Sequence, residues 1–168
     1  MKNKNYSRKG GLITTHCALI DFMEQLKDKM DPRHIEMIEQ ELRLADTVLR
    51  NITSVDDTIQ LDHLSNCFRN IDRFLGGIWR DVKPSTRPLP LETTIEGVSK
   101  RLEEKKSNME LKYSSVAAAE LKGVKLCLDK CGLGEDDRAR EHLYSVVNNT
   151  DLYISKSLDV DPSGPKKR

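Results

Sequence analysis

The chain has 168 residues, a length that suits one domain burying roughly two thirds of its unfolded surface. Its composition is 33% charged and 5% aromatic, which favours long solvated helices over a β-sandwich. The 28 Lys and Arg side chains nearly balance the 27 Asp and Glu, so no global positive field marks a nucleic-acid binder. The apolar runs are far shorter than the ~20 residues that cross a bilayer, and no secretory signal is recognisable. We therefore expect a cytoplasmic or nuclear protein without a membrane partner.

The N-terminal segment, residues 1–11, is basic and has no apolar period. It carries Lys2, Lys4, Arg8 and Lys9 and ends in a pair of glycines. These features predict a flexible basic arm.

Two helices are predicted after this arm. Apolar residues spaced three and four apart from Leu12 to Met30 predict the first, with His16 as a satisfied core or boundary histidine. Asp31 and Pro32 then predict a new start, since Asp is a good N-cap and Pro fits the first helical position. A second apolar row flanks the main stripe of this helix and predicts a central place with neighbours on two sides. The main stripe consists of Ile35, Ile38, Leu42, Ala45, Leu49 and Ile52.

A third helix is predicted from a start signal at Ser54 and Asp57, whose spacing resembles a capping box. Its apolar period continues to Val82. The pair Gly76 and Gly77 interrupts the pattern at roughly 1 kcal/mol per Gly relative to Ala. Either the helix frays there or a partner helix approaches closely.

Residues 83–92 form the clearest linker, because three prolines favour a stiff, extended connection. The scarce aromatic residues Phe74 and Trp79 precede it. Since aromatic side chains often anchor binding surfaces, we predict a partner-contact surface from Phe74, Trp79, Pro88 and Pro90. The alternative is that both rings belong to the core.

The segment after the linker is predicted to be helical, with a capping box from Thr93 to Glu96. A further capping-box spacing inside residues 94–131 leaves open whether this segment is one helix or two. Residues 99–112 are mostly polar and are expected to project into solvent. Gly132 predicts a glycine C-cap.

A last helix is predicted from the acidic residues near 135 to about Leu158. Residues 159–168 then form a basic tail that ends in Lys166, Lys167 and Arg168. With the preceding proline, this ending resembles a short nuclear-import signal.

The four cysteines are sparse and mostly lie inside helical patterns, so we interpret them as reduced thiols. They are Cys17, Cys67, Cys127 and Cys131. Cys127 and Cys131 share one helical face and could hold half of a zinc site, but two further ligands are not evident in the sequence. Buried structural thiols are the preferred interpretation.

No pattern of catalytic residues is present, whether a nucleophile motif, a phosphate loop or the Glu-x-x-His pairs of di-metal bundles. The nearest metal-type pair is Asp31 with His34, but Asp31 is better used as an N-cap. His63 and His142 have acidic neighbours in sequence and are expected to be solvated. We therefore predict no catalytic residue, no cofactor and no metal ligand.

Together these features predict an all-α antiparallel bundle of five or six amphipathic helices over residues 12–158, with the linker at 83–92 between the third and fourth. The function they favour is a non-enzymatic protein–protein interaction or oligomerisation module. One alternative is a nucleic-acid-binding accessory protein of viral type that uses the basic termini. The other is a secreted four-helix cytokine lacking its signal peptide.

Overall fold

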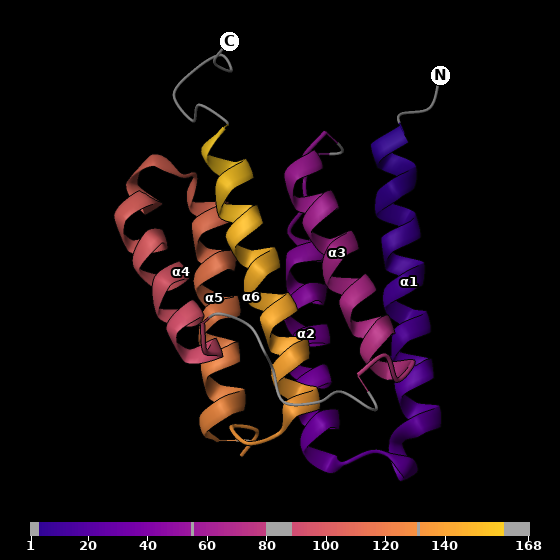
Figure 1. The fold of residues 1–168 in the computed structure, drawn as a ribbon. Coiled ribbons are helices and arrows are strands. Elements are labelled where there is room, and N and C mark those ends of the chain that lie inside the picture. The colour runs from indigo at the N-terminus through magenta and orange to yellow at the C-terminus, as the bar shows by residue number, and fades with distance from the viewer. Residues whose placement is uncertain (1–3, 55, 80–88, 131, 160–168) are drawn as a thin grey trace.

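The protein is an all-α bundle, as the sequence predicts. The computed structural model describes residues 4–54, 56–79, 89–130 and 132–159, which form six α-helices and two short 3-10 helices and contain no strand. Figure 1 shows the helices side by side, with α1 at one edge and α4 at the other. The α-helices are α1 (Lys4–Leu26), α2 (Pro32–Arg50), α3 (Thr58–Leu75), α4 (Leu91–Lys105), α5 (Leu111–Asp129) and α6 (Asp137–Leu158).

Helix α1 begins inside the segment that was expected to be a flexible arm. Its first turns are held by charged side chains that reach neighbouring elements. Arg8 pairs with Asp62 on α3 at 2.8 Å, and the Lys9 ammonium donates to the backbone carbonyl of Ile52 at 2.7 Å. Contacts with distant parts of the chain therefore extend the helix beyond its apolar period, which is why the pattern places the start too late.

Helix α2 begins where the sequence predicts. The Asp31 carboxylate accepts a hydrogen bond from the backbone N–H of Arg33 at 2.8 Å, and Pro32 occupies the first helical turn. Both apolar rows are used, since Ile38 on one and Met37 on the other are fully buried. The helix packs against α1, α3 and α5, which confirms its central place.

The cap of α3 lies later than predicted. Its N-cap is Asp57, whose carboxylate accepts from the backbone N–H of Gln60 at 3.2 Å. The Ser54 hydroxyl instead accepts from the backbone of Asp56, in the turn before the helix. The expected capping box at Ser54 is therefore wrong, because the chain turns once more before the helix starts.

Helix α3 also ends earlier than its apolar period suggests. Gly76 is the C-cap and Gly77 has a φ of +86°, a left-handed conformation that glycine adopts without strain. Ile78 is consequently outside the helix and 45% exposed. The expected extension to Val82 lies outside the described residues.

Helix α4 starts at Leu91, inside the predicted linker, because the exposed Pro90 serves as its N-cap. The expected capping box at Thr93 and Glu96 is therefore not used. The part of the linker from 80 to 88 is outside the described residues.

The long segment after the linker forms two helices, α4 and α5. Between them lie a short 3-10 helix, Lys106–Asn108, and Met109, which has an extended backbone and is buried. Residues 103–108 are exposed, whereas Leu102 is buried. The polar stretch 99–112 thus spans the end of α4, the connection and the start of α5, and it is not a helical projection.

Helix α6 packs against α3, α4 and α5. Asp136 caps its start by accepting from the backbone N–H of Ala139 at 3.0 Å. After α5, Gly132 has a φ of +69°, as expected for a glycine that ends a helix. In the part of the chain that the structure describes, no helix is both long and apolar enough to cross a membrane.

Candidate functional site

The interior of the bundle contains histidine–carboxylate pairs between helices. Three of the four histidines are buried, and each contacts an acid that is distant in sequence. The expectation that His63 and His142 are solvated is wrong, because a buried polar ring is tolerated when another helix supplies its partner. The pairs are His34 with Asp136 (2.8 Å), His63 with Glu120 (2.6 Å) and His142 with Glu41 (2.9 Å).

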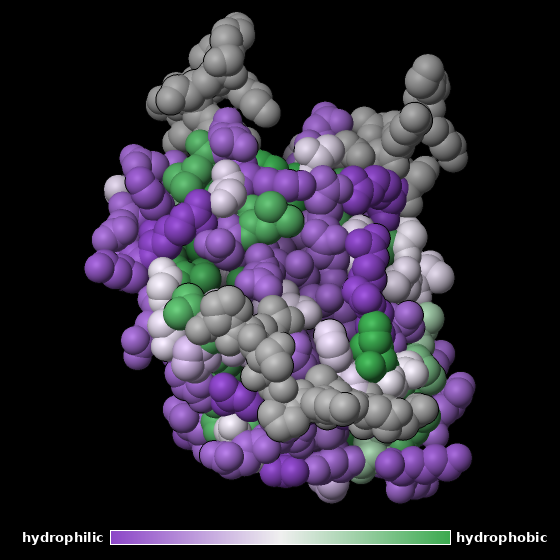
Figure 2. Space-filling view, in the orientation of Figure 1, coloured by the Kyte–Doolittle hydropathy of each residue, from purple (hydrophilic) through white to green (hydrophobic). Residues whose placement is uncertain are grey.

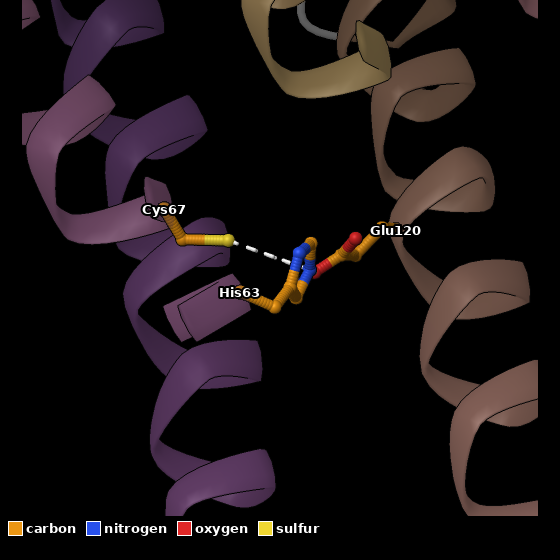
Figure 3. A group of neighbouring side chains, drawn as sticks. All are labelled: His63, Cys67 and Glu120. Atoms are coloured by element: carbon orange, nitrogen blue, oxygen red, sulfur yellow. Dashed lines mark hydrogen bonds and ion pairs between the residues drawn. The ribbon is translucent and has the colours of Figure 1, made fainter. Parts of the chain in front are cut away.

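The pair formed by His63 and Glu120 is extended by Cys67, and we call these three residues the His63 cluster (Figure 3). His63 and Cys67 are four residues apart on α3, so they share one face, and Glu120 faces them from α5. The Sγ atom of Cys67 lies 3.6 Å from Nε2 of His63 and 3.8 Å from Oε2 of Glu120. The side chains of His63 and Glu120 are only 3% and 9% exposed.

Helix α6 holds the His63 cluster from a third side. The Thr150 hydroxyl, which is buried, donates to Oε1 of Glu120 at 2.9 Å. The ring of Tyr153 stacks on the His63 imidazole at a centroid distance of 4.1 Å and an angle of 19°. The carboxylate and the ring are thus each fixed by a neighbour outside the cluster.

The electrostatics of the His63 cluster argue against a reactive thiol. Burial raises the pKa of the Cys67 thiol, and the facing His63 ring does not offset this. Burial alone would lower the pKa of His63, but Cys67 and Glu120 hold it well above 6.5. A nucleophilic cysteine needs a lowered pKa and a histidine that contacts its thiol and its acid through different nitrogens. Here both Cys67 and Glu120 face Nε2, so the cluster is not a catalytic triad.

A cavity of about 50 Å³ adjoins the His63 cluster, and we call it the chamber. Its lining includes Cys67 and Glu120 from the cluster, together with Glu41, Asn70 and Asn149. The Nδ2 atoms of both asparagines are buried and have no hydrogen-bond partner among the described residues. A water molecule occupies roughly 10–15 Å³ on this measure, so the chamber has room for a few small polar ligands.

A second group of possible ligands, Asp31, His34 and Asp136, lies where α2 and α6 begin. Both carboxylates cap a helix, and Arg33 lies between them, 2.8 Å from Asp31 and 3.6 Å from Asp136. Hydrogen bonds from Arg33 lower the pKa of Asp31 to about 2. A positive charge therefore already neutralises this group, which acts as a capping network.

The predicted contact surface is only partly exposed. Phe74 is fully buried between the rings of His34 and His142, at centroid distances of 5.2 and 4.9 Å. It is a core residue, which corrects its assignment to a surface. Trp79 is half-buried against the core, Pro90 is exposed, and Pro88 lies outside the described residues.

The basic residues of the N-terminal segment are partly engaged within the chain. Arg8 pairs with α3, and Lys9 binds a carbonyl after α2. Lys4 begins α1. Lys2 and residues 166–168 lie outside the described residues, so their predicted roles stay predictions.

Cys17 is an exposed free thiol and Cys67 a half-buried one, whereas Cys127 is buried and its thiol lies 4.0 Å from Oε1 of Gln40. Cys131 lies outside the described residues, so its pairing with Cys127 stays a prediction. The sequence signal for the His63 cluster is the spacing of four between His63 and Cys67, which differs from the Glu-x-x-His pattern of di-metal bundles.

The arrangement differs from that of the di-metal helical bundles, which place Glu-x-x-His pairs on two helices. Here a His and a Cys come from α3 and one Glu from α5. No protein-family model, curated protein or solved structure matches the chain. Its function is therefore inferred from its own residues and their geometry.

Proposed function

We propose that this protein is a non-enzymatic interaction module that associates with a second copy of itself through the outer face of α1. The observation that carries this proposal is that α1 is apolar on two faces. Leu12, Leu19 and Met23 are buried against the bundle, whereas Ile13 and Ile20 are 47% and 36% exposed. A helix that is apolar on both sides is typical of one that is covered on both sides. In Figure 1, however, α1 lies at the edge of the bundle.

The exposed apolar residues Ile13, Cys17 and Ile20 form what we call the α1 outer stripe. Their spacing of four and three residues places them on one line along the helix, the spacing of a helix–helix seam. Green and pale residues along the α1 side of the molecule, among largely hydrophilic surroundings, are visible in Figure 2. The stripe therefore offers a seam for another helix.

The charges around α1 favour a second copy as the occupant. A groove of about 290 Å³ between α1 and α2 adjoins Ile20, and its lining includes three acids, Glu24, Glu39 and Asp46, and one basic residue, Arg43. The opposite end of α1 has no acid before residue 10 and carries Lys9 and Arg8, whose side chain stays 34% exposed although it pairs with Asp62. In an antiparallel pair of α1 helices, the basic end of each copy lies against the acidic groove of the other. Such a two-fold contact closes on itself as a dimer.

The non-enzymatic part of the proposal is supported by the His63 cluster. Burial raises the pKa of the Cys67 thiol, and Cys67 and Glu120 both face the same nitrogen of His63, so the cluster lacks the geometry of an activated nucleophile. Among the described residues, the other close group of possible ligands, Asp31, His34 and Asp136, contains no Cys.

Mass measurement tests the proposal. Light scattering after gel filtration, under reducing conditions, should show a monomer–dimer equilibrium for the native sequence. The double variant Ile13→Lys with Ile20→Lys should be monomeric, because charges replace both apolar contacts. Leu111→Lys is the matched control, since Leu111 is 79% exposed on α5 and lies away from the stripe. A native chain that stays monomeric, or a dimer that the double variant leaves intact, would overturn the proposal.

Oxidative cross-linking tests the antiparallel register. Because Cys17 lies at the centre of the α1 outer stripe, the two-fold axis brings the two copies of this thiol together. Mild oxidation should trap a disulfide-linked dimer of the native sequence, and Cys17→Ser should abolish it. A dimer in which Cys17 does not cross-link would rule out this register.

We propose a cytoplasmic or nuclear location, which the free thiols of Cys17 and Cys67 support because structural disulfides form mainly in oxidising compartments. Titration of the unfolded native protein with a thiol reagent tests this. All four cysteines should react. Intact disulfides in protein from its natural source would instead favour the secreted alternative.

A further inference from the structure

Beyond self-association, we infer that the His63 cluster binds one divalent transition-metal ion of the zinc type. An imidazole nitrogen, a thiolate sulfur and a carboxylate oxygen are the three ligand types that zinc uses in proteins. Their ligand atoms all lie within 4.8 Å of one another. A nitrogen and a sulfur in the set disfavour magnesium and calcium, which prefer oxygen ligands only.

The distances within the cluster suit tetrahedral coordination. Bonds of about 2.0–2.3 Å to a tetrahedral zinc ion place neighbouring ligand atoms roughly 3.3–3.6 Å apart. The sulfur of Cys67 lies 3.6 Å from the His63 nitrogen and 3.8 Å from the Glu120 oxygen. Two of the three distances between ligand atoms are therefore close to the tetrahedral value. The third distance, 2.6 Å between Nε2 of His63 and Oε2 of Glu120, is that of a hydrogen bond. To hold an ion, this distance must increase by ~0.7 Å, which a small rotation of the Glu120 side chain supplies.

The side from which Cys67 and Glu120 face His63 also indicates an atom bound by all three residues. Cys67 and Glu120 both face Nε2 of His63, as Figure 3 shows. One ring nitrogen offers either one proton or one lone pair, so it cannot satisfy both partners with good geometry. An ion between the three groups contacts all of them at once.

Neighbouring residues orient the ligands in the way that metal sites require. The Thr150 hydroxyl donates to Oε1 of Glu120 and leaves Oε2 directed at the cluster. Tyr153 stacks on the ring of His63 and sets its plane. Such outer contacts fix the orientation of ligating carboxylates and imidazoles.

The chamber provides the remaining coordination position. Cys67 and Glu120 line it, so one side of the cluster opens into a space of about 50 Å³ whose lining is mainly apolar. That volume accommodates a water molecule as fourth ligand, and the buried amides of Asn70 and Asn149 can donate to chamber water. With a thiolate and a carboxylate as ligands, a divalent ion leaves no net charge in the interior.

The capping network at Asp31, His34 and Asp136 does not share these properties. Arg33 already binds both of its carboxylates, so a cation there would meet a positive charge. The inference is therefore confined to the His63 cluster.

Cobalt(II) titration tests the inference on the full native chain, kept reduced and stripped with a chelator. One equivalent of Co²⁺ should bind and produce the near-ultraviolet band of a thiolate–cobalt bond, and Zn²⁺ should displace it. A correctly folded native chain that binds no Co²⁺, or binds it without the thiolate band, would overturn the inference.

Substitutions assign the ligands. Cys67→Ser should remove the thiolate band and weaken Co²⁺ binding by at least about tenfold, and Glu120→Gln should weaken it similarly. Cys17→Ser is the matched thiol control and His16→Gln the matched histidine control, and both should bind Co²⁺ like the native chain. Far-ultraviolet circular dichroism verifies the fold of each variant. A thiolate band that survives in Cys67→Ser would place the ion elsewhere and overturn the inference. If a substituted chain does not fold, the spectrum of the native chain decides.

Discussion

The Nε2 atom of His142 lies 2.9 Å from each carboxylate oxygen of Glu41, which is 101 residues away in the chain. The imidazole is completely buried. Removing the acid leaves this nitrogen without its partner, so Glu41→Ala should lower the free energy of unfolding by about 1–3 kcal/mol. Urea denaturation measures the change. Glu36→Ala, at an exposed position of the same helix, should differ from the native chain by less than about 0.5 kcal/mol. Equal losses for both variants would contradict a stabilising role of the pair.

Asp57 should contribute more to stability than Ser54. Its carboxylate accepts from the backbone of Gln60 at 3.2 Å and from the hydroxyl of Tyr113 at 3.1 Å, and Lys112 lies 3.1 Å away. Loss of a helix cap costs about 1 kcal/mol, and loss of a buried hydrogen bond costs about another. Asp57→Ala should therefore lower the free energy of unfolding by roughly 2 kcal/mol. Ser54→Ala should have a much smaller effect, and the reverse order would place the cap at Ser54.

The ion pair between Glu92 and Arg140 should make stability depend on pH. Hydrogen bonds from Arg140 at 2.8 and 2.9 Å lower the pKa of Glu92 from 4.5 to about 2. The folded state therefore favours the ionised acid, so the stabilisation is complete above pH 4.5 and is lost as the pH falls towards 2. Because the Glu92 side chain is 57% exposed, solvent screening limits the effect to below about 1 kcal/mol.

Thermal melts above pH 4.5 and near pH 2 measure this contribution, with Glu92→Gln as the test variant. Its melting temperature should fall less between the two conditions than that of the native chain. Glu96→Gln removes an exposed acid from the same helix and controls for the change in net charge. A Glu92→Gln chain that loses as much stability as the native chain would show that the pair does not set this dependence.

The effect of replacing Gly123 on stability should depend on Gln40. A Cβ at this position of α5 would lie 2.6 Å from Nε2 of Gln40, the flexible end of a side chain on α2. Replacing a mid-helix Gly by Ala gains about 1 kcal/mol in helix propensity, and here the displaced amide offsets that gain. Gly123→Ala should thus be nearly neutral in the native chain and stabilising by up to about 1 kcal/mol in the Gln40→Ala background.

Gly97→Ala is the control for this double-mutant cycle, because nothing lies within 4 Å of a Cβ added there on α4. It should stabilise the chain in either background by a similar amount, up to about 1 kcal/mol. Urea denaturation of all variants gives the coupling. If Gly123→Ala has the same effect in both backgrounds, the contact with Gln40 is not the reason for the glycine.

The helices were predictable where the spacing of apolar residues and a local cap together determine the pattern. In α2, the spacing of apolar residues and the cap at Asp31 agree with the structure. The boundaries were less predictable, because they depend on tertiary contacts and on single residues. Arg8 and Lys9 hold the first turns of α1 through contacts that no local pattern reveals. Gly77, in a left-handed conformation, ends the α3 region although the apolar period continues beyond it.

The His63 cluster was predictable only in part. The spacing of His63 and Cys67 places them on one face of a helix, which the sequence alone shows. Glu120 could not be assigned to the cluster from the sequence, because its place there depends on how α5 is positioned relative to α3. For His142, the adjacent acid in sequence favours exposure, yet the ring is fully buried. Which helical face a residue occupies, rather than the charge of the adjacent residue, determines its burial.

Helix α6 emerges from the ribosome after the other five helices, yet it packs against α3, α4 and α5. Until residues 137–158 have been synthesised, these three helices keep apolar faces without their final cover. The core therefore cannot be completed before the last helix has been synthesised. Until α6 docks, the nascent chain exposes apolar surface that favours aggregation. A ribosome that stalls before α6 would leave a polypeptide with five helices and no closed interior, a natural substrate for chaperones and proteases.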